Sequence, residues 1–209
     1  MSTAVPATST DVDLTDVRYI VLNAIKLGML EALLVLLFSL ASRFLHGPVE
    51  HILEIILVVV GIAAVVALPG TWTRPRTIEG IGGAAGIGLG ATIVFMLIDV
   101  SLLQPTGTWS DRWLGIGGGA NWWYHPVWWM VGTFMPWMGA FILSNQAARG
   151  GASVVKLLLS VLVAAIIFAI VGVLIHVPHA GWTLGTFAVA VLPALAAVCL
   201  VSGLGPRRA

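Results

Sequence analysis

The sequence has very little charge. Only 9% of its 209 residues are charged, whereas 59% are hydrophobic, and the mean hydropathy is +1.02. A soluble globular domain carries about 25% charged residues, so this composition excludes that class and indicates a membrane protein. Ten basic and nine acidic residues leave a formal net charge of +1. That charge gives no electrostatic reason to expect nucleic acid or another polyanion as a partner.

Cysteine is almost absent, and so are the common catalytic signatures. The one cysteine, Cys199, stands inside an apolar run, which excludes an intrachain disulfide, a CxxC redox pair and a thiolate metal cage. The sequence contains no HExxH, no P-loop and no Gly-x-Ser-x-Gly elbow. A glycine-rich stretch at 86–91 follows no strand and lies within an apolar segment, so we expect no nucleotide. No catalytic residue is assigned, and the sequence leans away from an enzyme without deciding the question.

Six apolar stretches are long enough to cross a bilayer, whose hydrocarbon core of about 30 Å needs about 20 helical residues. The sequence therefore predicts an all-α, polytopic membrane bundle of six transmembrane helices in a single domain of residues 17–203. A polar N-terminal tail at 1–16 precedes this domain, and a basic tail at 204–209 follows it. The predicted spans are 27–45, 49–68, 80–103, 126–145, 153–176 and 183–201.

The positions of Lys and Arg predict the orientation of the bundle. With an even number of spans, both termini share a side with the loops between spans two and three and between spans four and five. That side carries eight basic residues, whereas the opposite side carries only Arg43 and Arg112. This asymmetry predicts cytoplasmic termini. We expect a bacterial inner membrane, with the opposite face periplasmic or exterior.

The inner end of the first span leaves two features open. Residues 17–26 are amphipathic at helical spacing, which fits either a separate interfacial helix or an extension of the span. Glu31 follows about one turn inside the span. Pairing with Lys26 or snorkelling to the surface would satisfy its charge there.

All five histidines are predicted to lie on the outer side, together with three carboxylates. Imidazole and carboxylate are common ligands of first-row divalent metals, and the same groups can relay protons. At an interface they can equally be solvated by water and headgroups. No established ligand spacing unites them, so the sequence does not say whether they converge in space. The candidates for a metal site or proton relay are His46, Glu50, His51, Glu54, Asp99, His125, His176 and His179.

Tryptophan is concentrated around the outer loop before the fourth predicted span. Seven of the nine tryptophans lie within 109–137, beside a glycine run at 117–119. Such a stretch is typical of an aromatic belt at headgroup level. It also fits a cover over a site, a docking surface for another subunit, or packing against the ring of a quinone or pigment. The candidate contacts for a partner or hydrophobic ligand are Trp109, Trp113, Trp122, Trp123, Trp128, Trp129 and Trp137.

A glycine stripe marks the third predicted span. Gly82, Gly86 and Gly90 form two successive GxxxG steps, which let another helix approach closely. The stripe predicts a central, tightly packed third helix. Asp99 would then lie at the crowded outer end of that helix.

Three functions remain open, because membrane architecture alone does not determine function. The sequence favours a structural or accessory subunit of a larger membrane complex, which contacts lipid and other membrane subunits or a hydrophobic cofactor. The contacts would come from the tryptophan-rich loop and the glycine-rich helix. The alternatives are a small ion or solute transporter or channel, and a metalloenzyme or redox subunit with its metal at the outer face. A divalent metal, a quinone and a pigment all remain open as cofactors.

Overall fold

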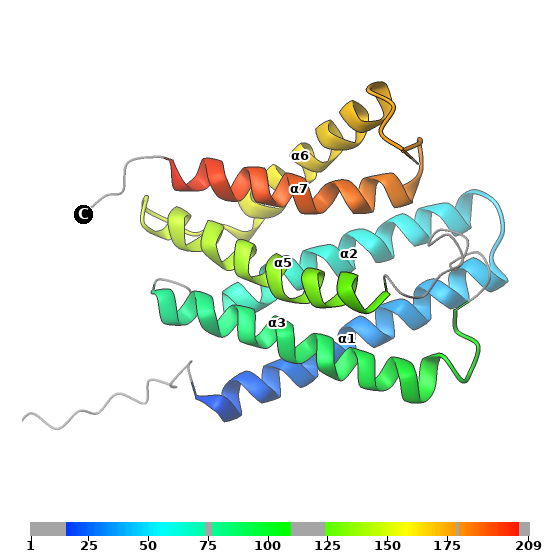
Figure 1. The fold of residues 1–209 in the computed structure, drawn as a ribbon, viewed down its shortest axis with the longest axis horizontal. Helices are drawn as coiled ribbons and strands as arrows, with labels where there is room; N and C mark the ends of the chain where they lie inside the picture. Colours follow the sequence, from blue (N-terminus) through cyan, green and yellow to red (C-terminus); the bar gives the residue numbers. More distant parts are fainter. Residues whose placement is uncertain (1–15, 74–76, 110–123, 179, 205–209) are drawn as a thin grey trace, which may run out of the picture.

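A computed structural model describes residues 16–73, 77–109, 124–178 and 180–204. Within these ranges the chain is helical and has no strand, so the all-helical prediction is confirmed (Figure 1). Five helices are long and apolar enough to cross a membrane: α1, α2, α3 together with η1, α6 and α7. The remaining helix, α5, occupies the fourth predicted span. The helices are α1 (Val17–Phe44), α2 (Pro48–Thr73), α3 (Ile78–Ile98), the π-helix η1 (Asp99–Leu103), α5 (Tyr124–Ala147), α6 (Val154–Leu174) and α7 (Leu184–Gly203).

Consecutive helices run in opposite directions (Figure 1). The start of α1 and the end of α7 consequently lie at the same end of the bundle, which we call the inner end. The ends of α1, α3 and α6 lie at the opposite, outer end, together with the starts of α2, α5 and α7. The assignment of these ends to the two sides of a membrane remains a prediction from the basic residues.

The first helix is continuous through the amphipathic residues 17–26. It contains 28 residues, which at 1.5 Å per residue span about 42 Å, more than a hydrocarbon core needs. The hydroxyl of Tyr19 donates a hydrogen bond of 3.0 Å to the carbonyl of Trp72 and so fastens the first turn of α1 to the end of α2. The amphipathic stretch is thus an extension of the first span and not a separate helix.

The second helix passes through Pro69 and Gly70, where the sequence predicts its end. Proline lacks a backbone donor, but neighbouring helices and hydroxyl side chains can offset that loss in membrane helices. Pro69 leaves the carbonyl of Val65 without its usual helical donor. Here the close contact of Gly70 with Ala140 of α5 holds the helix in place, while the hydroxyl of Thr73 donates to the carbonyl of Pro69 at 3.0 Å in the last turn. Tertiary packing therefore carries α2 on to Thr73.

The helix α3 lies in the middle of one half of the bundle, packed against α1, α2 and α5. Glycines permit two of these approaches, because a Cβ on Gly88 would overlap Gly132 and Pro136 of α5, and one on Gly90 would lie 2.7 Å from Cβ of Ala24. Gly86 has only an ordinary contact with α1, and Gly82 has no neighbour within 4 Å.

A second core joins α2, α5, α6 and α7, and it includes Val66, Ile142, Leu157 and Leu195. The helix α6 packs mainly on α7 and touches α2 and α5 only slightly. It diverges from the bundle toward the outer end (Figure 1). One flank of the molecule is therefore open where α6 separates from α2.

Candidate functional site

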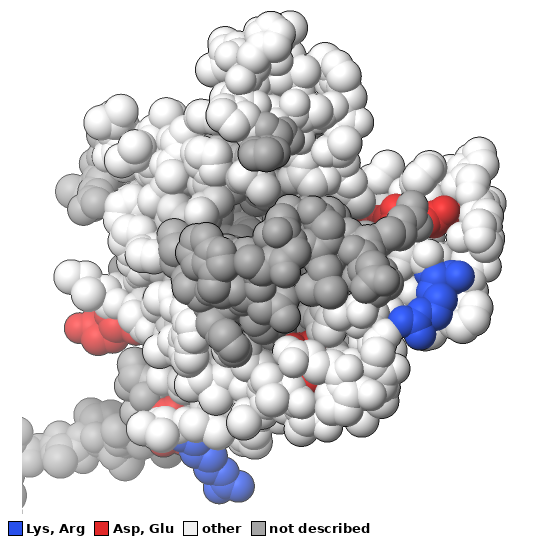
Figure 2. Space-filling model, turned by 45° about the vertical axis from the view of Figure 1, so that its right-hand side comes forward, with Lys and Arg blue, Asp and Glu red and all other residues white. Residues whose placement is uncertain are grey.

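Polar and charged residues at the outer end are few and mostly separate. Figure 2 shows a face with coloured side chains only at scattered places on an otherwise white and grey surface. The outer candidates with described side chains are His46, Glu50, His51, Glu54, Asp99, His176, Trp109, Trp129 and Trp137. The side chains of His125, His179, Trp113, Trp122, Trp123 and Trp128 lie outside the described residues.

Asp99 has the most fully built polar environment of these candidates. The residue has no exposed surface, and both of its carboxylate oxygens accept hydrogen bonds. The amide of Gln104 donates to Oδ2 at 2.6 Å, and the indole of Trp109 donates to Oδ1 at 2.6 Å. The carboxylate thus holds together the segment that follows α3.

The π-helix explains how Gln104 reaches back to Asp99. Over five residues, the wider turn of η1 places the backbone N–H of Gln104 2.8 Å from the carbonyl of Asp99. The chain then turns at Gly107, whose φ of +69° favours glycine. Residues 104–109 consequently fold back over the end of α3.

Two side chains of α1 fasten this turn from the other side. The hydroxyl of Ser39 donates to the carbonyl of Thr108 at 2.5 Å, and the guanidinium of Arg43 donates to the carbonyl of Gly107. Trp109 also packs beside Phe95 in a small apolar cluster. We call residues 99–109, with Ser39 and Arg43, the outer cap. It anchors the chain at the start of the tryptophan-rich stretch.

The start of α2 carries a separate pair. Nδ1 of His51 lies 3.6 Å from Oε2 of Glu54, with side chains 66% and 14% exposed. Glu50 is buried in the first turn of the same helix. Since ion pairs open to solvent are worth little, the His51 pair adds little stability.

The remaining described histidines stand apart. His46 is exposed in the turn between α1 and α2, and His176 is exposed after α6, in a left-handed conformation with φ of 57°. The end of α6 lies away from the corner formed by α1 and α2 (Figure 1). Among the described side chains, no three His, Cys, Asp or Glu residues are grouped to hold a metal. A metal held by three such groups at this end would need at least one ligand from outside the described side chains.

Two described tryptophans lie on the side of the bundle. Trp129 and Trp137 of α5 are both exposed. The ring of Trp137 meets Phe134 edge-on at 6.5 Å between centroids and Phe141 at 6.2 Å. These aromatics form a strip along α5 and not a cover over the outer cap.

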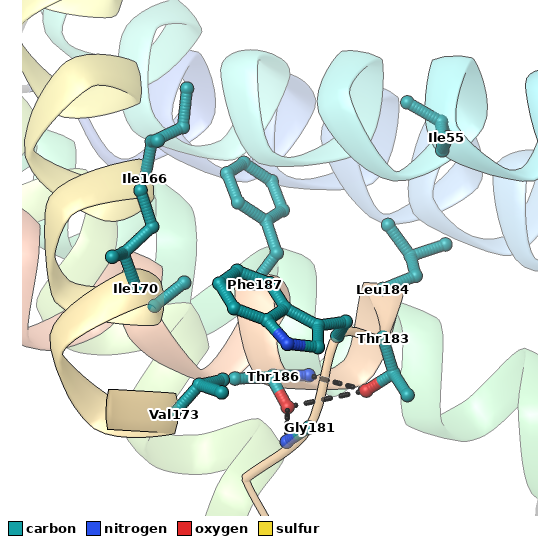
Figure 3. A pocket seen from close by; sticks show the side chains of 11 residues that line it. Ile55, Ile166, Ile170, Val173, Gly181, Thr183, Leu184, Thr186 and Phe187 are labelled. Carbon is teal, nitrogen blue, oxygen red and sulfur yellow. Dashed lines mark hydrogen bonds between the residues drawn. The ribbon is translucent and has the colours of Figure 1, made fainter. Parts of the chain in front are cut away.

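Sequence reasoning missed a groove between α2, α6 and α7 (Figure 3). It has a volume of about 450 Å³, and its walls are apolar. The ring of Phe187 lies in the space between Ile166 and Ile170 of α6 and Ile55 of α2 (Figure 3). No motif could have revealed this groove, because α6 is apolar apart from Lys156 and Ser160 and these two residues do not line the groove. Only the angle between α6 and α2 creates it.

The outer rim of the groove is polar. The N–H of Thr186 donates to the hydroxyl of Thr183 at 3.3 Å, which caps the start of α7. The N–H of Gly181 donates to the hydroxyl of Thr186 at 3.0 Å (Figure 3). Trp182, which the sequence interpretation did not single out, is exposed beside them. The groove therefore has apolar walls along its length and hydrogen-bonded polar groups at its outer rim.

The structure also places Glu31 differently from the sequence expectation. Glu31 is buried, so it does not snorkel to the surface. The ammonium of Lys26 lies 3.4 Å from the amide oxygen of Asn23, and no ion pair joins it to Glu31 among the described residues.

Comparisons with known proteins identify no relative of this chain. No family model matches it, and no curated protein or solved structure does either. The functional conclusion therefore depends on the geometry of the described residues.

Proposed function

We propose that this chain is an integral membrane subunit of a larger membrane complex, with a structural or accessory role. Its proposed contact for a neighbouring subunit or a hydrophobic cofactor is the groove between α2, α6 and α7. The observation that carries this proposal is the separation of α6 from α2, which leaves an apolar concave surface of about 450 Å³ on helices suited to lipid. Ligand pockets typically have volumes of about 300–1,000 Å³.

Shape supports the groove as a contact surface. Lipid tails are as apolar as leucine, so helices associate in a bilayer through close packing and not through the hydrophobic effect. The groove between α2 and α6 offers such packing to a helix ridge or a flat ring. The rim at Thr183 and Thr186 lies where a polar end of that occupant would emerge.

The glycine-rich helix supports internal packing more than partner contact. Atoms of α5 and α1 already occupy the space beside Gly88 and Gly90, whereas a Cβ added at Gly82 would have no neighbour within 4 Å. The tryptophan-rich stretch remains a second proposed contact, held at its start by the outer cap. Both contacts would belong to the periplasmic or exterior half of a bacterial inner membrane, with the termini in the cytoplasm.

The two alternative functions have less support from the described contacts. A metal centre would need ligands beyond the His51–Glu54 pair. A transporter that used Asp99 would have to break its bonds to Gln104 and Trp109. Neither alternative is favoured by a specific contact.

A pair of photocrosslinking variants tests the proposed contact. Ile170 lines the groove, whereas Ile167 lies one turn earlier on α6, is exposed, and does not line it. A photoreactive amino acid at position 170 is expected to give one discrete adduct with a protein or a cofactor in native membranes. The same amino acid at position 167 should give only diffuse lipid adducts. Lipid adducts alone at both positions would contradict the proposal.

A further inference from the structure

Glu31 is a buried acid within a membrane-spanning helix. Only 8% of the residue is exposed, and α1 is one of the helices suited to cross a bilayer. No hydrogen bond or ion pair engages its carboxyl group within the described part of the chain. The carboxyl group is thus enclosed without a polar protein partner in those ranges.

The helices around Glu31 approach closely. Gly28 lies one turn before it, and a Cβ there would lie 2.6 Å from the carbonyl oxygen of Ala91 and 2.7 Å from Cβ of Val94. On the other side, Ala32 packs beside Phe95 in a buried cluster. Glu31 therefore lies where α1 contacts the backbone of α3 most tightly.

The neighbouring helices supply no charge at this level. Neither the segment 80–98 of α3 nor the segment 55–73 of α2 contains an ionisable residue. The nearest such groups on these helices are Glu79 and Asp99 at the two ends of α3, and Glu54 beside His51 on α2. On α5 the ionisable residues are Tyr124 and His125, both in the first turn, and Lys26 of α1 binds Asn23. Hence the stretches of α2 and α3 between these end groups offer the carboxyl group no charged partner.

An ionised carboxylate without a partner is far costlier in an apolar interior than a neutral carboxylic acid. We propose that Glu31 is a proton-binding site inside the membrane. Its carboxyl group holds a proton while α1 is packed on α3, and it passes that proton to water when this contact opens. The O–H bond of the carboxyl group breaks, the carboxylate keeps the electron pair, and a lone pair of the water oxygen forms a new O–H bond with the proton. Proton occupancy and the packing of α1 on α3 are therefore linked, so rising pH favours the open arrangement.

Infrared spectroscopy of the full chain in lipid vesicles tests whether the proton is present. At neutral pH the wild type is expected to show a carbonyl stretch from a protonated carboxyl group. That component should be missing in both Glu31→Gln and Glu31→Met, which cannot hold this proton. The matched control is Glu79→Gln, which removes an exposed glutamate at the start of α3 and should leave the component unchanged. A component that survives both Glu31 substitutions would overturn the proposal.

A second measurement tests whether the proton can leave. Thermal unfolding of the wild type should shift to lower temperature as the pH rises from about 4.3, the ordinary pKa of a glutamate, through neutral, because over that range the unfolded chain releases a proton that the folded state still holds. Most of this shift should vanish in Glu31→Gln, because glutamine cannot ionise. If the pH dependence were the same in both proteins, Glu31 would not be a proton-binding site. The expected result supports the proposal whether or not the chain has a partner subunit.

Discussion

Asp99 shows how one buried carboxylate can organise the outer end. Its two oxygens accept from donors five and ten residues later, so a single side chain closes the loop after α3. The same residue starts η1, whose wide turn brings Gln104 back toward it. Short π-helical segments are frequent at functional positions. Here the segment positions the chain at the start of the tryptophan-rich stretch.

We predict that Asp99→Ala lowers the free energy of unfolding by about 1–3 kcal/mol, because the partly buried indole N–H of Trp109 loses its acceptor, whereas the amide of the exposed Gln104 can bind water instead. Asp99→Asn should cost less, because one amide oxygen can still accept from Trp109. Equilibrium unfolding in mixed micelles measures both changes. The control is His46→Ala at an exposed position, for which we expect a change within about 0.5 kcal/mol. Equal stability of Asp99→Ala and the wild type would show that the outer cap does not depend on this carboxylate.

The two buried acids could be predicted from the sequence to different degrees. The sequence placed Asp99 near the crowded end of the third span, because the glycine stripe indicated close packing there. Its partners Gln104 and Trp109 were not predictable, since they depend on a π-helical turn that has no sequence signature. For Glu31, the sequence left pairing with Lys26 and snorkelling to the surface open, and the described contacts show neither, because Lys26 binds Asn23 and the buried Glu31 shares a helix face with Gly28, which packs on α3.

At the scale of elements, hydropathy and length predict helices well but helix ends poorly. The positions of α6 and α7 follow from two apolar runs. Ser153 and Thr183 stand just before these runs, and their side chains cap the first turns of the helices. The extension of α2 beyond Pro69 was not predictable, because it depends on Thr73 and on the close approach of α5. The groove was missed for a similar reason, since no local pattern encodes the angle between α6 and α2.

Two glycines of α3, one closely packed and one in open space, provide a matched pair of variants that tests how tightly this helix packs. We expect Gly88→Ala to lower the free energy of unfolding by about 1–3 kcal/mol, because the added methyl group would overlap the backbone of Gly132 and the ring of Pro136. Gly82→Ala adds the same group to open space, so it should be neutral or stabilising by up to about 1 kcal/mol. Denaturant titration in micelles measures the difference. If both variants were equally stable, the close approach of α3 and α5 would be in doubt.

At the scale of the whole molecule, the bundle has a compact part and an open flank. The helices α1, α2, α3 and α5 surround glycine contacts and buried polar groups, whereas α6 depends mainly on α7. In the compact part, glycines let the helices pack closely on one another. The groove beside α6 remains open to a bound partner or cofactor. We infer that internal stability resides in the first part and that association uses the second.

The proposed orientation can be tested with two single cysteines in a Cys199→Ser background. His46→Cys lies in the exposed turn between α1 and α2, and Ala152→Cys lies in the exposed turn between α5 and α6 at the other end. A membrane-impermeant thiol reagent added to intact cells should label position 46, because the basic residues predict that this end faces outward. Position 152 should react only after permeabilisation. The reverse pattern would place the termini outside.

The most direct test of the proposed subunit role is the native mass of the protein extracted gently from its own membranes. A subunit that fills its groove with a partner should appear at one defined mass, equal to this 22.0 kDa chain plus a partner chain or cofactor in fixed ratio. Ile170→Trp, which would fill the groove between α2, α6 and α7, should reduce that species in favour of the single chain. A homogeneous single chain from native membranes, with no bound component, would contradict the account.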